Sequence, residues 1–255
     1  MARTSARRVP SGALRELDAR LKAAGSPERA RWDKAYLKSD LTFYGVTLPK
    51  LHRVAREYAR KHPDLDRRQL RVIALGAYAT RKHDLRSAAI ALLDRRRASL
   101  EERDLPWLLD IVDASNTWAH VDWLAVGVIG DVVGRYPASL RWLPKWAKQK
   151  NFWVRRTALL AQHDQLKGGE GDWMLFTRLA DTMLDEREFF IRKAIGWVLR
   201  ETSKKRPKIV YDYLRPRRER VSGLTLREGA KYLSDTQRRS MGLEPWRDRA
   251  GKPYR

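Results

Sequence analysis

Apolar side chains recur every three or four positions along most of the chain, which is the period of one buried face of an α-helix. The two clearest stripes are formed by Val121, Leu124, Ala125, Val128, Ile129 and Val132, and by Ile191, Ala194, Ile195, Val198 and Leu199. No segment alternates with a period of two over the length of a strand, and no Asn-Gly or Asp-Gly hairpin turn occurs. The pattern predicts an all-α protein.

Glycine and proline mark the boundaries of the predicted helices. Gly25 has the position of a residue just after a helix end, and Pro27 follows a serine that can cap the next helix. Residues 40–49 interrupt the periodicity, and further helices are predicted over about 50–61 and 67–82. The chain is therefore expected to consist of helices joined by short turns.

Apolar helices open at near-constant intervals from residue 85 onward. The opening residues Leu85, Trp118, Trp153 and Phe190 are separated by 33, 35 and 37 residues. A second helix is predicted within each interval, over Leu105–Asp113, Leu140–Lys148 and Asp172–Asp185. This spacing predicts an α-solenoid of HEAT-like helical repeats, whose second helices line a concave surface. We expect one repeat domain over residues 1–237 and a basic C-terminal extension over 238–255.

The charge balance narrows the classes of function that the protein can have. The 255 residues include 54 Lys+Arg against 31 Asp+Glu, a formal net charge of +23, while an apolar share of 43% and 10 tryptophans exclude a disordered basic tail. Residues 201–255 alone contain 16 lysines and arginines against 7 acidic residues. Because self-repulsion opposes folding, this charge favours a polyanionic partner, most commonly nucleic acid. A well-solvated surface in an arginine-rich proteome is the alternative interpretation.

Several classes of site and location are not favoured by the sequence. The absence of cysteine excludes disulfides, a thiol nucleophile and cysteine-ligated metals, and the five histidines contain no pair at i, i+4. We therefore expect no metal and no cofactor. The basic first residues lead into no apolar stretch, and no apolar run approaches the ~20 residues that span a bilayer. We expect a cytoplasmic protein with no membrane partner.

Two predicted helices carry residues suited to a nucleic-acid site. Trp118 and Asp122 are four positions apart, so they share one face, and Asp122 lies on the flank of the apolar stripe. A packing tryptophan and a salt-bridged aspartate are the alternative. On the helix opened by Trp153, Arg155 and Arg156 could clamp a phosphate, and we expect Arg156 to be exposed. A cation–π or solvent-facing pair is the alternative for these arginines.

A third helix places Phe190, Lys193 and Trp197 at spacings of three and four, on a side apart from its apolar stripe. A large aromatic side chain beside a lysine and opposite the core indicates a functional role, although a second layer of helix packing would also account for it.

Four segments resemble the AlkD-type DNA alkylation-repair glycosylases. They are Asn-Thr-Trp-Ala-His-Val-Asp over 116–122, Phe-Trp-Val-Arg-Arg-Thr-Ala-Leu over 152–159, Phe-Phe-Ile-Arg-Lys-Ala-Ile-Gly-Trp-Val-Leu-Arg-Glu over 189–201, and an N-terminal signature with Tyr-Leu-Lys-Ser from 36 and Phe-Tyr-Gly-Val from 43. The similarity covers roughly residues 27–235. It implies that Asp122 is the catalytic carboxylate, that Trp118 and Trp197 flank the sugar and backbone of the damaged nucleotide, and that Arg156 holds the adjacent phosphate. Tyr36 would line the same cleft, with a core tyrosine as the alternative.

The implied chemistry needs only one carboxylate. A purine alkylated at N3 or N7 already carries positive charge and leaves readily, so a carboxylate that stabilises the oxocarbenium-like sugar and orients water suffices. The sequence therefore predicts a monofunctional alkylpurine DNA glycosylase of base excision repair, a hydrolase that acts as a monomer on double-stranded DNA bound in a basic concave groove. The alternatives are a catalytically silent DNA-binding relative and a HEAT-type scaffold for protein or RNA partners.

Overall fold

The computed structural model describes residues 11–247, and this part of the chain forms helices and no strand. A single β-bridge joins Thr42 and Lys82 within it. The prediction of an all-α protein is confirmed. No helix in this range is long and apolar enough to cross a membrane.

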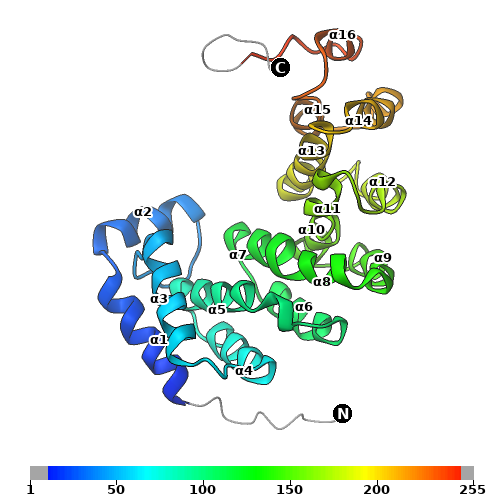
Figure 1. Ribbon diagram of the computed structural model, residues 1–255. Helices are drawn as coiled ribbons and strands as arrows, with labels where there is room; N and C mark the ends of the chain where they lie inside the picture. Colours follow the sequence, from blue (N-terminus) through cyan, green and yellow to red (C-terminus); the bar gives the residue numbers. More distant parts are fainter. Residues whose placement is uncertain (1–10, 248–255) are drawn as a thin grey trace. The chain divides into compact units, whose positions relative to one another are not determined.

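The chain divides into two compact units, Met1–Val132 and Val133–Arg255. Unit 1 contains α1 (Ser11–Ala24), α2 (Pro27–Leu37), α3 (Leu48–Lys61), α4 (Arg67–Tyr78), α5 (His83–Arg95), α6 (Leu105–Asp113) and α7 (Trp118–Asp122), shown in Figure 1. A π-helix (Trp123–Ile129) follows α7 and leads into α8 (Gly130–Arg135). Unit 2 continues with α9 (Leu143–Trp146), α10 (Phe152–Leu160), α11 (His163–Gly168), α12 (Trp173–Asp181), α13 (Phe189–Ser203), α14 (Pro207–Leu214), α15 (Gly223–Gly229) and α16 (Asp235–Arg239).

Helix α5 is the central element of unit 1. Ten consecutive residues of this helix, from Asp84 to Leu93, are buried, and α5 packs against α3, α4 and the π-helix. An amphipathic helix buries one stripe only, so burial on all sides marks a helix enclosed by its neighbours. In unit 2, α13 has the corresponding place, packed by α10, α11, α14 and α15.

Local sequence signals explain where several helices begin. The Ser26 hydroxyl accepts a hydrogen bond from the backbone N–H of Arg29 at 3.4 Å, and Pro27 occupies the first turn of α2, as predicted. Asp66 and Gln69 form a reciprocal capping box at the start of α4. The 3₁₀ turns Arg97–Ser99, Glu102–Asp104, Pro137–Trp142 and Arg215–Arg217 fill connections between helices.

Three predicted boundaries are wrong. Helix α4 ends at Tyr78 rather than 82, because the buried guanidinium of Arg86 donates hydrogen bonds to the carbonyls of Tyr78 and Thr80 and so completes the end of the helix. The helix predicted over 140–148 is a 3₁₀ helix followed by the single turn α9, each with a proline in its first turn. Helix α12 ends at Asp181, four residues before the predicted end.

The apolar stripe from Val121 to Val132 is buried as predicted, but its backbone is not one regular α-helix. The stripe passes from α7 through the π-helix into α8, and its six members are fully buried. A π-helix segment changes the number of residues per turn, and such segments are frequent at functional sites. Asp122 is the last residue before this change.

The predicted C-terminal extension lies partly outside the described residues, which end at 247. Its described part belongs to unit 2, because Arg238 is buried and donates hydrogen bonds to the carbonyls of Ala230 and Glu244. Met241 is also buried. The single repeat domain over 1–237 and the concave groove stay predictions.

Candidate functional site

Helix α7 fixes the positions of Trp118 and Asp122 in unit 1. The Thr117 side chain caps the helix by accepting a hydrogen bond from the backbone N–H of Ala119, and α7 then runs for five residues. Trp118 begins the helix and Asp122 ends it, both partly exposed, while Val121 between them is fully buried. The short helix therefore presents an indole and a carboxylate on one accessible side, one helical turn apart.

Tyr36 of α2 comes to Trp118 from a distant part of the chain. The two rings meet edge to face, with centroids 6.0 Å apart and planes at 79°. Tyr36 also stacks on Trp32 in a nearly parallel arrangement, with centroids 4.9 Å apart. Because the Tyr36 side chain is 58% exposed, the interpretation of Tyr36 as a core tyrosine is wrong. The structure thus brings Tyr36 against Trp118, and Asp122 lies one helical turn from Trp118 on the same short helix.

A stack of three rings, two of them buried and one partly buried, supports α7 from behind. The His83 ring lies between those of Phe43 and His120, at centroid distances of 4.4 and 4.5 Å, and the Ser87 hydroxyl lies 2.9 Å from His120 Nε2. Burial lowers the pKa of His83 to about 4, assisted by the nearby charge of Arg86. Burial also holds the pKa of His120 well below its usual value. Both imidazoles are therefore neutral at pH 7, and they serve as packing groups under Trp118 and Asp122.

A cavity of about 530 Å³ opens in unit 1 beside Trp118. Trp118 and Trp123 contribute its aromatic walls, and Asp94 on its lining accepts a hydrogen bond from the Trp123 indole N–H at 3.1 Å. Asp84 on the same lining accepts backbone N–H groups of Tyr44 and Val46. Sequence reasoning missed Trp32, Trp123 and Asp94, because none of them belongs to a motif with a fixed spacing.

In unit 2 the structure corrects the predicted exposure of Arg156. Its side chain is only 2% exposed. The guanidinium donates a hydrogen bond to the backbone carbonyl of Phe190 and lies 5.8 Å from the centre of the Phe190 ring. Trp153 also packs on Phe190, at a centroid distance of 4.7 Å. Arg156 therefore joins α10 to the start of α13, and periodicity on α10 alone could not reveal this burial.

Arg155 is held within unit 2 by four hydrogen bonds. Its Nε and Nη2 atoms donate to the two carboxylate oxygens of Glu186, at 2.9 and 2.7 Å. Its Nη1 atom donates to the carbonyls of Gln149 and Lys150, at 2.8 and 2.7 Å. A bidentate arginine of this kind fixes the turn before α10.

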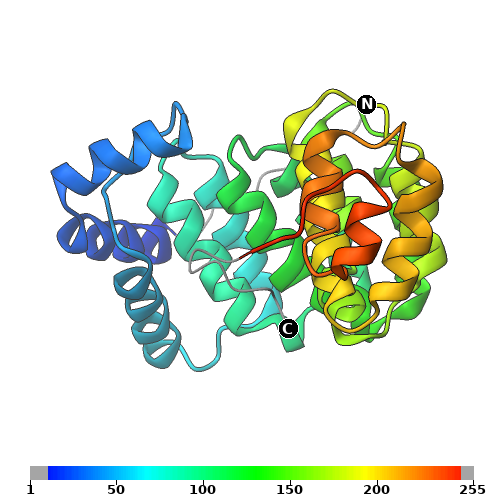
Figure 2. The same ribbon diagram turned by 90° about the horizontal axis from the view of Figure 1, so that it is seen from above.

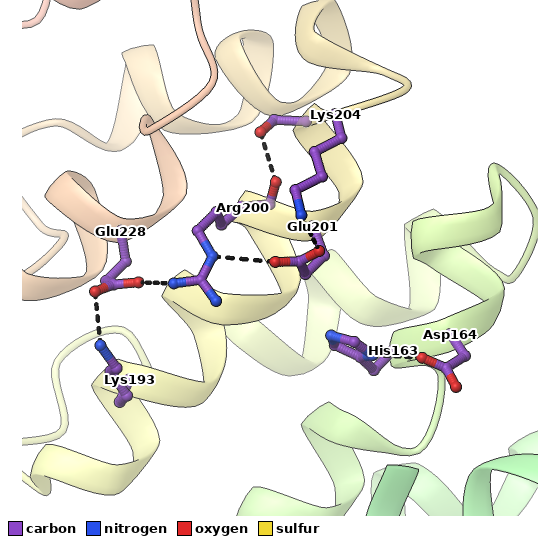
Figure 3. Close-up of polar contacts among 8 residues, drawn as sticks. His163, Asp164, Lys193, Arg200, Glu201, Lys204 and Glu228 are labelled. Carbon is purple, nitrogen blue, oxygen red and sulfur yellow. Dashed lines mark hydrogen bonds and ion pairs between the residues drawn. The ribbon is translucent and has the colours of Figure 1, made fainter. Parts of the chain in front are cut away.

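Lys193 and Trp197 lie on the partly exposed side of α13, apart from the buried residues Ile191 and Ala194. Lys193 donates to Glu228 Oε1 of α15 at 2.6 Å, and Arg200 pairs with the other oxygen of that carboxylate at 2.5 Å. Arg200 also contacts Glu201, as Figure 3 shows.

Glycine permits this close approach of α15 to α13. A Cβ atom at Gly196 would lie 2.7 Å from that of Glu228. Burial by itself would raise the pKa of Glu228. The hydrogen bond from Lys193 and the charges of Lys193 and Arg200 together outweigh burial, so the pKa of Glu228 lies below its usual value. The carboxylate is ionised and fixes both cations along α13. Trp197 packs on His163, with ring centroids 4.6 Å apart.

The predicted site residues are thus divided between the two units. Unit 1 holds Tyr36, Trp118 and Asp122, and unit 2 holds Arg155, Arg156, Lys193 and Trp197. No group of three or more histidine, aspartate or glutamate side chains between residues 11 and 247 is arranged to hold a metal ion.

The sequence profile of the DNA alkylation repair enzyme family matches residues 17–233. The chain belongs to this family. The family resemblance inferred from the sequence is therefore confirmed, and DNA alkylation repair is the function that the family name assigns. Among proteins with curated descriptions, none matches the chain significantly.

Solved structures show the same fold as this DNA alkylation repair family member. A protein described as a predicted DNA alkylation repair enzyme from Enterococcus faecalis is 26% identical, with a TM-score of 0.74 over 82% of this chain and 97% of that chain. AlkD2 from Streptococcus mutans is 18% identical, with a TM-score of 0.58 over 80% of this chain and 99% of that chain. The protein smu.31 from Streptococcus mutans UA159 is also 18% identical, with a TM-score of 0.56 over 84% and 100% of the two chains. The last two likenesses concern the fold alone.

Proposed function

We propose that this protein is a monofunctional DNA glycosylase that hydrolyses the N-glycosidic bond of positively charged N3- or N7-alkylated purines in duplex DNA. The observation that carries the proposal is the accessible group of Tyr36, Trp118 and Asp122 in unit 1 of a DNA alkylation repair family member. The group combines aromatic faces with one carboxylate.

This combination suits the departure of a cationic base. The alkylated purine leaves without protonation, so no second carboxylate is needed as a general acid. As the glycosidic bond breaks, positive charge develops on the sugar, and the Asp122 carboxylate stabilises it and orients a water molecule for attack at C1′. The indole face of Trp118 adds further stabilisation of a nearby cation.

The residues of unit 2 supply DNA contacts in this proposal. Trp197, exposed in part beside Lys193, contacts the backbone of the damaged strand, and Arg156 supports the phosphate site from a buried position. Arg155 acts by fixing the turn before α10, through its pair with Glu186. A net charge of +23 favours duplex DNA as the partner, and we propose a monomer that works in the cytoplasm, on the nucleoid.

The test is single-turnover excision from methylated duplex DNA by the parent protein and by Asp122→Asn. The substitution keeps the size of the side chain and removes its negative charge, so release of 3-methyladenine and 7-methylguanine should slow by ~10²–10³, or about 3–4 kcal/mol of barrier. Asp110→Asn on α6, which alters another exposed aspartate, is the matched control and should excise at the parent rate.

Two results would contradict the proposal. If Asp122→Asn excises as fast as the parent protein and only its melting temperature falls, Asp122 has a structural role. If the parent protein binds methylated duplex DNA but releases no base, the protein is a catalytically silent DNA-binding relative.

A further inference from the structure

Helix α2 is unusual because none of its eleven residues, all of them described, is buried. The helix is anchored at its first turn, where the Ser26 N–H donates to the Tyr44 carbonyl at 2.9 Å. Gly45, at a φ of 73°, lies so close to this turn that a Cβ atom would be 2.3 Å from the Ser26 carbonyl. Beyond this anchor, α2 lies at the edge of unit 1 in both views (Figures 1 and 2).

Two large aromatic side chains project from this unburied helix. Trp32 is 53% exposed and Tyr36 is 58% exposed. Apolar side chains of a surface helix ordinarily face the core, where their burial stabilises the helix. An isolated helix of this length is marginal in water and depends on packing for its stability. Aromatic side chains that remain in solvent provide little of this packing. Their exposure is better explained by a ligand.

The aromatic side chains form an ordered series that leads to the candidate site. Trp32 and Tyr36 are nearly parallel, at 13°, and Tyr36 contacts Trp118 edge to face. The Arg29 guanidinium lies 4.4 Å from the centre of the Trp32 ring. Arg29 precedes Trp32 by about one turn and Tyr36 follows it by about one turn, so both lie beside the indole on one side of the helix.

The cover supplied by Arg29 is easily exchanged. Arg29 pairs with Asp33 through Nε and Nη2, at 3.1 and 2.9 Å, and the arginine side chain is 44% exposed. An exposed ion pair of this kind contributes little stability. A DNA phosphate can replace Asp33 as the partner of the guanidinium, which would uncover the part of the Trp32 ring that Arg29 now covers. A stacking ring next to a phosphate-binding cation is the combination that binds single-stranded nucleic acid.

We propose that Trp32 and Tyr36 form a stacking platform for an unpaired nucleobase of the DNA bound by this protein, with Arg29 on the flanking phosphate. The inference rests on the proposed function in one respect, that DNA is the ligand. Every nucleobase presents a π face, but in a paired duplex both faces are covered by neighbouring bases. The platform therefore selects DNA in which one base has left the stack, next to Trp118.

The experiment compares two undamaged duplexes of one sequence, one fully paired and one with a single bulged 2-aminopurine. Dissociation constants and 2-aminopurine fluorescence are measured for the full-length parent, Trp32→Ala and Trp32→Phe. We expect the parent to bind the bulged duplex about 5- to 150-fold more tightly than the paired one and to quench its fluorescence. Trp32→Ala should lose both effects and bind the paired duplex as the parent does. Trp32→Phe, which keeps a ring, should retain most of the preference.

Met174→Ala is the matched control, since Met174 of unit 2 is 62% exposed and its loss tests removal of an exposed apolar group elsewhere. It should behave as the parent does. Equal affinity of the parent for both duplexes, or equal weakening of both by Trp32→Ala, would overturn the platform. These results are independent of excision from methylated DNA, so the platform and the glycosylase proposal can fail separately. A parent protein that binds neither undamaged duplex would also overturn the platform, whereas the glycosylase proposal is tested only by excision from methylated DNA.

Discussion

The neutral histidine pair beneath α7 makes stability fall as the solution becomes mildly acidic. His83 has a pKa of about 4 in the folded protein, against 6.5 for an ordinary histidine. Between these two values the unfolded chain binds a proton that the folded protein does not, so the free energy of unfolding decreases as the pH falls. The His120 pKa is lowered in the same direction, and its ring stacks on that of His83.

The size of the effect follows from the same pKa difference. Going from pH 7.5 to pH 5.0, the linkage relation gives a loss of about 2 kcal/mol of unfolding free energy for His83 alone. His120 adds to this loss. The comparison is limited to pH 5.0 and above, because ordinary carboxyl groups begin to titrate below that value and would obscure the histidine contribution.

Urea unfolding of the parent and of His83→Phe at the two pH values is the assay. Phenylalanine fits a position between Phe43 and His120, and His83 Nε2 has no hydrogen-bond partner among the described residues that the change would remove. We expect the urea midpoint of the parent to fall clearly at pH 5.0 and that of His83→Phe to fall by less, with the remaining decrease due to His120 and to His163, whose pKa burial also lowers. A parent midpoint that is the same at both pH values would refute the neutral state of these rings.

Two further predictions concern stability and DNA binding. Arg156→Ala should lower the free energy of unfolding by about 1–3 kcal/mol, because it leaves the Phe190 carbonyl without this buried donor, and an unchanged melting temperature would contradict the burial of Arg156. If about 5 phosphates are contacted, the logarithm of the affinity for duplex DNA should fall against the logarithm of salt concentration with a slope of roughly −4 to −5, and a flat dependence would favour a protein scaffold.

The parts of the fold that the sequence predicted depend on local signals. The start of α2 at Pro27 and the burial of the stripe from Val121 to Val132 follow from capping chemistry and from periodicity within a single helix. The end of α4 could not be predicted in this way, because the side chain that caps it is Arg86, a residue of the next helix. When a side chain from another element sets the end of a helix, the sequence of that helix contains no signal for the boundary.

In the candidate site, too, features set within one helix could be predicted and contacts between helices could not. The shared face of Trp118 and Asp122 could be predicted, because four residues make about one helical turn. The burial of Arg156 could not, because the carbonyl and ring that enclose it belong to Phe190 on another helix. The contact of Tyr36 with Trp118 joins residues 82 positions apart, and periodicity contains no information on such pairs.

Departures from ordinary folding rules gather around one region of unit 1. Helix α2 leaves Trp32 and Tyr36 in solvent, α7 ends after five residues at Asp122, and a π-helix begins at the next residue. Helix α2 adds nothing to the buried core, and the π-helix departs from regular α-helical geometry even though it buries part of the apolar stripe, whereas α5 beside them is a regular helix enclosed along most of its length. When local rules are broken together while the supporting core obeys them, selection for binding or catalysis is the physical explanation that remains. That is why the region around Tyr36, Trp118 and Asp122 is where loss of function without loss of fold is expected.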